Sequence, residues 1–169
     1  MSSGALVGTL VVAGVLVVSI TLAIQLRMRG WQRRVKQQAE LIGELPGMPD
    51  EVGTASLCTR GAYIGSVLSP AWNDRVAVGD LDYRCEAVLT QYPEGILLVR
   101  VGAQPIWIPR RSISAIRVER AITGKVSARS GVLAIRWRLP SGTEIDTGFR
   151  ATNRDEYDQW TQLGAEGAS

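Results

Sequence analysis

The 169-residue sequence predicts an N-terminal transmembrane helix followed by a mainly-β domain, a barrel or sandwich of about seven antiparallel strands capped by a C-terminal α-helix. Three observations predict this class. Residues 5–26 carry no charged side chain, residues 54–149 repeatedly alternate apolar and polar side chains between turn signals, and residues 152–163 combine an N-cap signal with one apolar stripe. At about 100 to 200 residues per domain, the chain has room for one modest domain and an appendage.

The uncharged run from Ala5 to Leu26 is long enough to cross a membrane. At 1.5 Å per helical residue it spans a hydrocarbon core of roughly 30 Å. A secretory signal peptide would need a positive start, a shorter apolar run and a small-residue cleavage site, whereas no Lys or Arg precedes this run. We therefore expect residues 1–4 to be a short extracytoplasmic N-terminus and residues 5–26 a transmembrane helix, with a buried core helix as the alternative.

Basic residues follow this run and predict its orientation. The expected membrane-interface residues are Arg27, Arg29, Trp31, Arg33, Arg34 and Lys36. Positive charge that flanks a span stays on the cytoplasmic side, and an indole sits well at headgroup depth. The sequence thus predicts a single-pass protein of the inner (plasma) membrane with its N-terminus outside and its C-terminal domain in the cytoplasm. The favoured explanation of the basic cluster is that it sets the membrane topology. The alternative is that it attracts anionic lipid, at about 1 kcal/mol per basic residue.

Residues 27–53 are expected to form a basic juxtamembrane helix and a linker. Apolar positions at helical spacing continue the helix to Leu45, Gly43 weakens it, and Pro46 stops it. Residues 46–53 hold two prolines, two glycines and two acids, a composition typical of a linker. The cytoplasmic domain should then occupy residues 54–169.

The strand pattern is clearest in residues 132–139. One face carries Leu133, Ile135, Trp137 and Leu139, and the other carries Arg136 and Arg138. The remaining expected strands are 84–92 and 96–101 as a hairpin, 105–109 as a proline-flanked edge strand, 112–119, 143–149 as the partner of 132–139, and one or two more within 56–65 and 74–78.

The C-terminal helix has its own start signal. Thr152 or Asn153 can cap it, with Asp155 or Glu156 completing a capping box. Its apolar stripe consists of Tyr157, Trp160 and Leu163. We expect this stripe to pack on the sheet.

Residues 146–148 read Asp-Thr-Gly, the triplet that carries the catalytic carboxylate of aspartic proteases. Such an enzyme needs two of these aspartates, related by a pseudo-twofold axis, and a half-barrel built after each. Only about 20 residues follow Gly148. We therefore expect Asp146 to be structural and to meet Arg136 or Arg138 across the hairpin, and Gly148 to let the last strand bend toward the helix cap.

Composition argues against several other classes of function. The chain has no histidine, and it shows no nucleotide-binding or nucleophile-elbow motif, so we expect no enzyme, no cofactor and no metal site. From Thr54 onward, 14 Lys and Arg face 12 Asp and Glu, a net charge of +2 (14 − 12), which does not predict nucleic-acid binding. Cys58 and Cys85 lack metal-ligand spacing, so two buried thiols are expected, with a disulfide as the less favoured alternative.

Four segments carry a resemblance to a known family. Residues 63–76 (YIGSVLSPAWNDRV), 94–113, 131–139 (GVLAIRWRL) and 146–150 (DTGFR) resemble actinobacterial single-pass membrane proteins with a bacterial pleckstrin-homology-like (PH-like) domain. The resemblance covers essentially the whole chain. It implies two nearly orthogonal sheets of seven strands closed at one corner by the C-terminal helix, and Trp160 matches a position where such helices often carry a core tryptophan.

The resemblance also implies a binding or scaffolding module, because domains of this fold bind lipids, peptides or other proteins. A protein partner in the membrane is the first hypothesis, in addition to the lipid bilayer itself. The alternative is an anionic lipid headgroup held by Arg110, Arg111 and Lys125, although solvated strand faces and loop ends are the favoured explanation of these residues. An accessory subunit of a transport or envelope-biogenesis complex is the more remote possibility.

Overall fold

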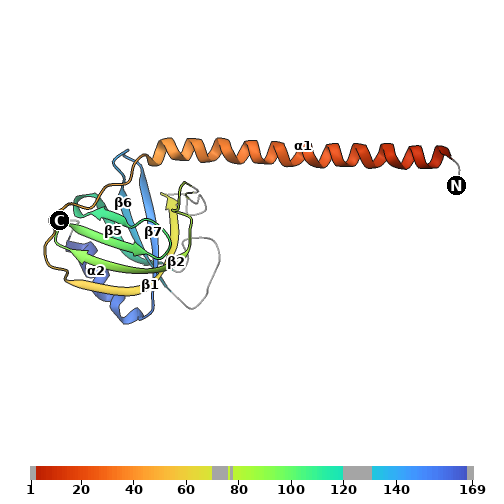
Figure 1. Ribbon diagram of the computed structural model, residues 1–169. Helices are drawn as coiled ribbons and strands as arrows, with labels where there is room; N and C mark the ends of the chain where they lie inside the picture. Colours follow the sequence, from red (N-terminus) through yellow and green to blue (C-terminus); the bar gives the residue numbers. More distant parts are fainter. Residues whose placement is uncertain (1–2, 70–75, 77, 120–130, 167–169) are drawn as a thin grey trace. The chain divides into compact units, whose positions relative to one another are not determined.

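The computed structural model describes residues 3–69, 76, 78–119 and 131–166, and within them the side chains of residues 30–35 are among those left undescribed. The chain divides into two compact units, Met1–Gln37 and Gln38–Ser169. Figure 1 shows the helix of the first unit and the β domain of the second.

Helix α1 runs from Ser3 to Ile42. Its segment Val11–Arg29 is long and apolar enough to cross a membrane, and a signal sequence would satisfy the same criteria. None of this segment is buried inside the protein, so the core-helix alternative is wrong. The helix ends at Ile42 because Gly43 adopts a left-handed conformation (φ 62°) and donates its N–H to the Ala39 carbonyl at 2.9 Å. The expected end at Pro46 was therefore too late.

The second unit contains a single seven-stranded sheet among the described residues. Its strands are β1 (Leu57–Leu68), β2 (Cys85–Tyr92), β3 (Gly95–Arg100), β4 (Ile106–Pro109), β5 (Ile113–Glu119), β6 (Val132–Arg138) and β7 (Glu144–Ala151). The spatial order is β4-β3-β2-β1-β7-β6-β5, and every neighbouring pair is antiparallel. This confirms the strand count and the edge position of residues 106–109. In the segment 74–78, Val76 and Val78 lie outside the strands, and Asp74, Arg75 and Ala77 lie outside the described residues.

The core lies on the inner face of this curved sheet. Its largest fully buried side chains include Trp137, Trp160, Tyr63 and Phe149. The alternation expected in β6 holds, because Leu133, Ile135 and Trp137 all belong to this core. Val132 and Ala134 on the opposite face are buried too, since they form a second, smaller cluster with Ile64 and Val67.

Gly148 lies inside β7 and not at its end. It pairs with Gly65 of β1, directly beside a register shift between Tyr63 and Gly65, and β7 continues to Ala151. The expected bend from Gly148 into the helix cap is therefore not present. The irregularity lies in β1 instead, where Gly65 has a φ of 130° that other residues rarely adopt.

The C-terminal helix begins with a short 3₁₀ turn η2 (Arg154–Glu156) and continues as α2 (Tyr157–Glu166). The Asn153 side chain accepts a hydrogen bond from the Asp155 N–H, so Asn153 is the cap. Glu156 accepts instead from the Thr59 hydroxyl of β1. Thr59 in turn accepts from the Trp160 indole N–H at 2.9 Å, which fixes the helix to the sheet.

The second unit includes residues that precede the expected boundary at 54. Ile42 is only 1% exposed and belongs to the core. The Leu41 carbonyl accepts hydrogen bonds from Ser141 Oγ at 2.5 Å and from Thr143 Oγ1 at 2.7 Å, and Leu45 packs against the core. The residues expected to be a free linker are thus partly held on the domain, since Gly53 also donates its N–H to the Glu94 carboxylate at 2.9 Å.

Candidate functional site

The arginines of the β domain fall into two groups, those with a carboxylate partner and those without one. Arg100 belongs to the first group and has a side chain that is 0% exposed. Its guanidinium donates to Asp80 Oδ1 and to the Asp80 carbonyl, each at 2.7 Å, and twice to the Gln104 carbonyl. The guanidinium carbon also lies 4.9 Å from the centre of the Tyr63 ring. Arg100 is therefore an internal brace between two loops.

Tyr63 extends this brace across the core. Its hydroxyl donates to the Leu81 carbonyl and lies 2.9 Å from Ser66 Oγ, and Ser66 contacts Thr147, which accepts from the Trp137 indole at 2.9 Å. Burial raises the pKa of Tyr63 to about 12, which keeps the hydroxyl neutral. This chain satisfies polar groups that would otherwise be costly inside a core. No local sequence pattern predicted it.

Asp146 lies at the centre of an ion-pair cluster on the outer face of β5, β6 and β7. Arg136 grips it with two hydrogen bonds of 2.9 Å, and Arg117 from β5 adds one of 2.8 Å. Burial alone would raise the pKa of Asp146, but the hydrogen bonds from Arg136 and Arg117 outweigh it, so that pKa lies below the usual aspartate range. The carboxylate is fully engaged by these partners, which supports a structural role for the Asp-Thr-Gly triplet.

Arg138 completes the neighbouring pair on the same face. It contacts Glu144 at 3.1 Å, directly across the hairpin as the register requires. Arg117 also pairs with Glu119. Three arginines and three acids thus neutralise one another on this face, which leaves no local excess of positive charge.

Arg110 and Arg111 belong to the second group, together with Arg60, Arg84 and Arg150. Arg110 and Arg111 lie in the short 3₁₀ turn η1 (Arg110–Ser112) between β4 and β5, both are exposed, and neither has a carboxylate partner among the described residues. Lys125, the third member of the expected patch, lies outside the described residues. The structure therefore brings two of the three basic residues together.

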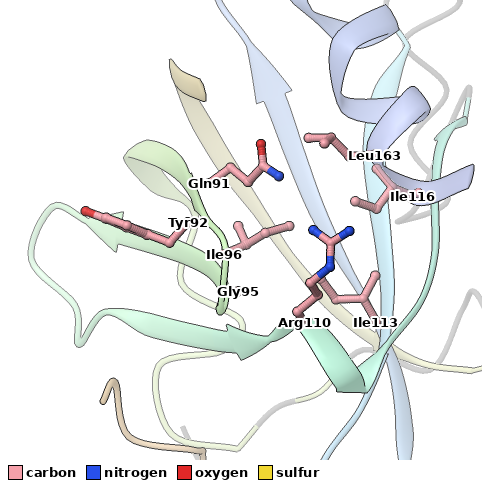
Figure 2. A pocket seen from close by; sticks show the side chains of 9 residues that line it. Gln91, Tyr92, Gly95, Ile96, Arg110, Ile113, Ile116 and Leu163 are labelled. Carbon is pink, nitrogen blue, oxygen red and sulfur yellow. The ribbon is translucent and has the colours of Figure 1, made fainter. Parts of the chain in front are cut away.

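Arg110 stands at the mouth of a small apolar pocket. Figure 2 shows its guanidinium pointing into the space between the β2–β3 hairpin, β5 and α2. Ile96, Ile113, Ile116 and Leu163 form the apolar wall, and the space is about 20 Å³, room for about one water molecule or a methyl group. Gly164 lets α2 approach β5 this closely, because a Cβ there would lie 2.9 Å from the Ile116 backbone nitrogen. Three stretches distant in sequence, 91–96, 110–116 and 163–164, build this pocket, so no single motif predicts it.

The expected membrane-interface residues lie on α1. The side chains of Arg27, Arg29 and Lys36 are exposed, whereas those of Trp31, Arg33 and Arg34 lie outside the described residues. Both cysteines are free, and the expectation that both thiols are buried is wrong. Cys58 is exposed and Cys85 is half-buried, because Cys58 shares the outer face of β1 with Arg60.

No group of three or more His, Cys, Asp and Glu side chains suited to a metal ion occurs in the part of the chain that the structure describes. The arrangement offers instead a β core, a helical cap and, at Arg110, an unpaired guanidinium beside an apolar hollow. A seven-stranded antiparallel sheet capped by a C-terminal helix is the architecture of the PH-like class, whose domains are typically non-catalytic binding modules. The chain belongs to the bacterial PH domain-like family, whose model matches residues 42–164.

One solved structure similar to the chain is described as "Vav1 inhibited by an allosteric inhibitor: Vav1 inhibitors block GEF activity". The two share 13% identity with a TM-score of 0.40, and the match covers 85% of this chain and 34% of the other. The chain thus spans about a third of that structure. No curated protein matches the chain.

Proposed function

We propose that this protein is a single-pass, actinobacterial, membrane-anchored PH-like module that holds a protein partner at the cytoplasmic face of the plasma membrane. The apolar segment of α1 and the basic residues that follow it support the anchor and its orientation. The family supports a binding or scaffolding role for the domain. An anchored domain needs only modest affinity, because confinement in one membrane raises the effective concentration of a membrane partner.

The observation that carries this proposal is the environment of Arg110. Arg100, Arg117, Arg136 and Arg138 each have a carboxylate partner, whereas the Arg110 guanidinium has none among the described residues. An arginine beside an apolar hollow is typical of an interface hot spot. The guanidinium fits an acidic side chain or a terminal carboxylate, and the hollow fits a methyl-sized group beside that carboxylate, a combination that peptides supply.

Photo-crosslinking in intact membranes tests this assignment. A photoreactive amino acid at Arg111, next to the pocket, should trap a discrete protein, and Arg110→Glu should abolish that adduct. Arg84→Glu is the matched control, because Arg84 is also exposed and lies just before β2, about 25 Å along the strand from the pocket. An adduct that persists in the Arg110→Glu variant would refute the role of the pocket.

Anionic lipid is the second candidate, and one observation favours it. Arg110 and Arg111 are adjacent, exposed and without carboxylate partners among the described residues, so both can reach a phosphate. Vesicles of phosphatidylcholine with and without cardiolipin distinguish the cases. If lipid is the ligand, the domain of residues 38–169 binds only the cardiolipin vesicles, and the Arg110→Glu/Arg111→Glu variant loses that binding while Arg84→Glu keeps it.

A further inference from the structure

A valine strip lies exposed on the outer face of β2 and β3 and just beyond the end of β3. Val99 is 47% exposed and Val101 is 64% exposed, although their neighbours Leu98 and Arg100 are buried. Val88 of β2 lies directly opposite Val99 and is half-buried, and Val101 donates its N–H to the Glu86 carbonyl at 2.9 Å. Three valines therefore adjoin one another on a surface that water contacts. Adjoining exposed valines of this kind mark an interaction surface more often than scattered single ones do.

The strip borders a hollow of about 360 Å³ that also reaches β1 and the end of β7. The charged groups at this hollow are Arg60 of β1 and Glu86 of β2. Arg60 lies opposite Val88, and Glu86 lies opposite Ala62, so the two charges are diagonal to each other and not paired. Neither forms an ion pair with a described residue. One basic and one acidic side chain thus flank the same apolar strip.

We propose that this face binds a second copy of the same chain. In a twofold arrangement, each surface meets its own image, so a patch that carries one charge of each sign is complementary to itself. Arg60 of one copy then faces Glu86 of the second copy, twice, and the two valine strips cover each other. A strongly acidic or basic partner is a poorer match, because this patch has no net charge. The protruding Val101 and the adjacent hollow provide a projection and a recess on the same face.

The strip is small, so the association should be weak in solution and strengthened by confinement of both copies in one membrane. Full-length protein carrying donor or acceptor dyes in proteoliposomes measures this by energy transfer at increasing protein-to-lipid ratio. The expected result is a saturable signal. Protein that stays monomeric at every ratio would overturn the proposal.

Three variants locate the interface. Val99→Glu should weaken association at least tenfold, whereas Val118→Glu, at 46% exposure on β5, should leave it unchanged. Association that survives Val99→Glu, as a contact between membrane helices alone would produce, refutes the face. Arg110→Glu should also leave the signal unchanged, which separates this proposal from the pocket proposed above.

A charge exchange tests the pairing itself and does not depend on whether Val99→Glu folds. Arg60→Glu and Glu86→Arg should each weaken self-association, because each places like charges face to face. The Arg60→Glu/Glu86→Arg double variant should restore it. Failure of the double variant to recover, while both single variants retain the fluorescence of the buried tryptophans, would rule out the twofold pairing.

Discussion

The ion pair between the buried Arg100 and the partly exposed Asp80 leads to a specific prediction for stability. Asp80→Ala removes the carboxylate that pairs with the Arg100 guanidinium, which has no exposed surface. Breaking a buried pair in this way costs about 3–5 kcal/mol, because the remaining charge is uncompensated. We expect the lower part of this range, since three of the four guanidinium hydrogen bonds go to the carbonyls of Asp80 and Gln104 and survive the change. The Gln104 N–H also loses its acceptor, Asp80 Oδ2.

The companion substitution makes this prediction refutable. Arg100→Met removes the charge, and in the Asp80→Ala/Arg100→Met double variant no buried ion is left, so the double variant should be more stable than Asp80→Ala alone. Urea unfolding of the full chain in mild detergent measures the free energies, with emission from the buried Trp137 and Trp160 as the signal. A cost below about 1 kcal/mol for Asp80→Ala would show that water satisfies the guanidinium, contrary to its burial.

Two further predictions concern the helix and the acidic groups. Trp160→Ala should destabilise the domain by about 3–5 kcal/mol by emptying a fully buried site. Thr59→Val, which removes the acceptor of the indole N–H and the hydroxyl donor to Glu156 but leaves the indole packed, should cost about 1–2 kcal/mol. Equal losses in urea unfolding would contradict this packing. Acidification should lower the melting temperature, because hydrogen bonds from arginines keep the pKa values of Asp146 and Asp80 below the usual range despite their burial. The contribution of these two carboxylates to stability is complete above about pH 4 and is lost as the pH falls through their folded-state pKa values. Asp146→Asn should therefore reduce the fall of the melting temperature at acidic pH. An unchanged fall would contradict the ion-pair cluster.

The sheet could be predicted because apolar and polar side chains alternate along its strands in the sequence. In β6 the inward positions are all large and apolar, and the partner strand places Asp146 opposite Arg136, so the register of the hairpin and its ion pair follow from the pattern. Arg100 carried a similar signal, since it shares the inward face of β3 with Ile96 and Leu98. The role of Arg100 could not be predicted because its partner, Asp80, lies 20 residues away in an irregular segment.

Other features depend on conformations or on contacts that no local pattern encodes. Helix α1 ends where Gly43 adopts a left-handed backbone conformation. Pro46 was expected to stop the helix because proline is the stronger stop signal in the sequence. The Arg110 pocket forms only where three stretches distant in sequence meet, and its small volume depends on Gly164, which lets the helix approach the sheet. Burial of Ile42 depends in the same way on residues about a hundred positions later.

The contact between Leu41 and Ser141 also has a consequence for the order of biosynthesis. These residues are 100 positions apart, and at about 5–20 residues per second a ribosome needs about 5 to 20 s to travel from one to the other. During that interval the last turn of α1 exists without the hydroxyl groups that later bind its carbonyl, and β1 lacks its neighbour β7. The last turn of the helix is thus made before any strand and is among the last segments to be joined to the finished domain.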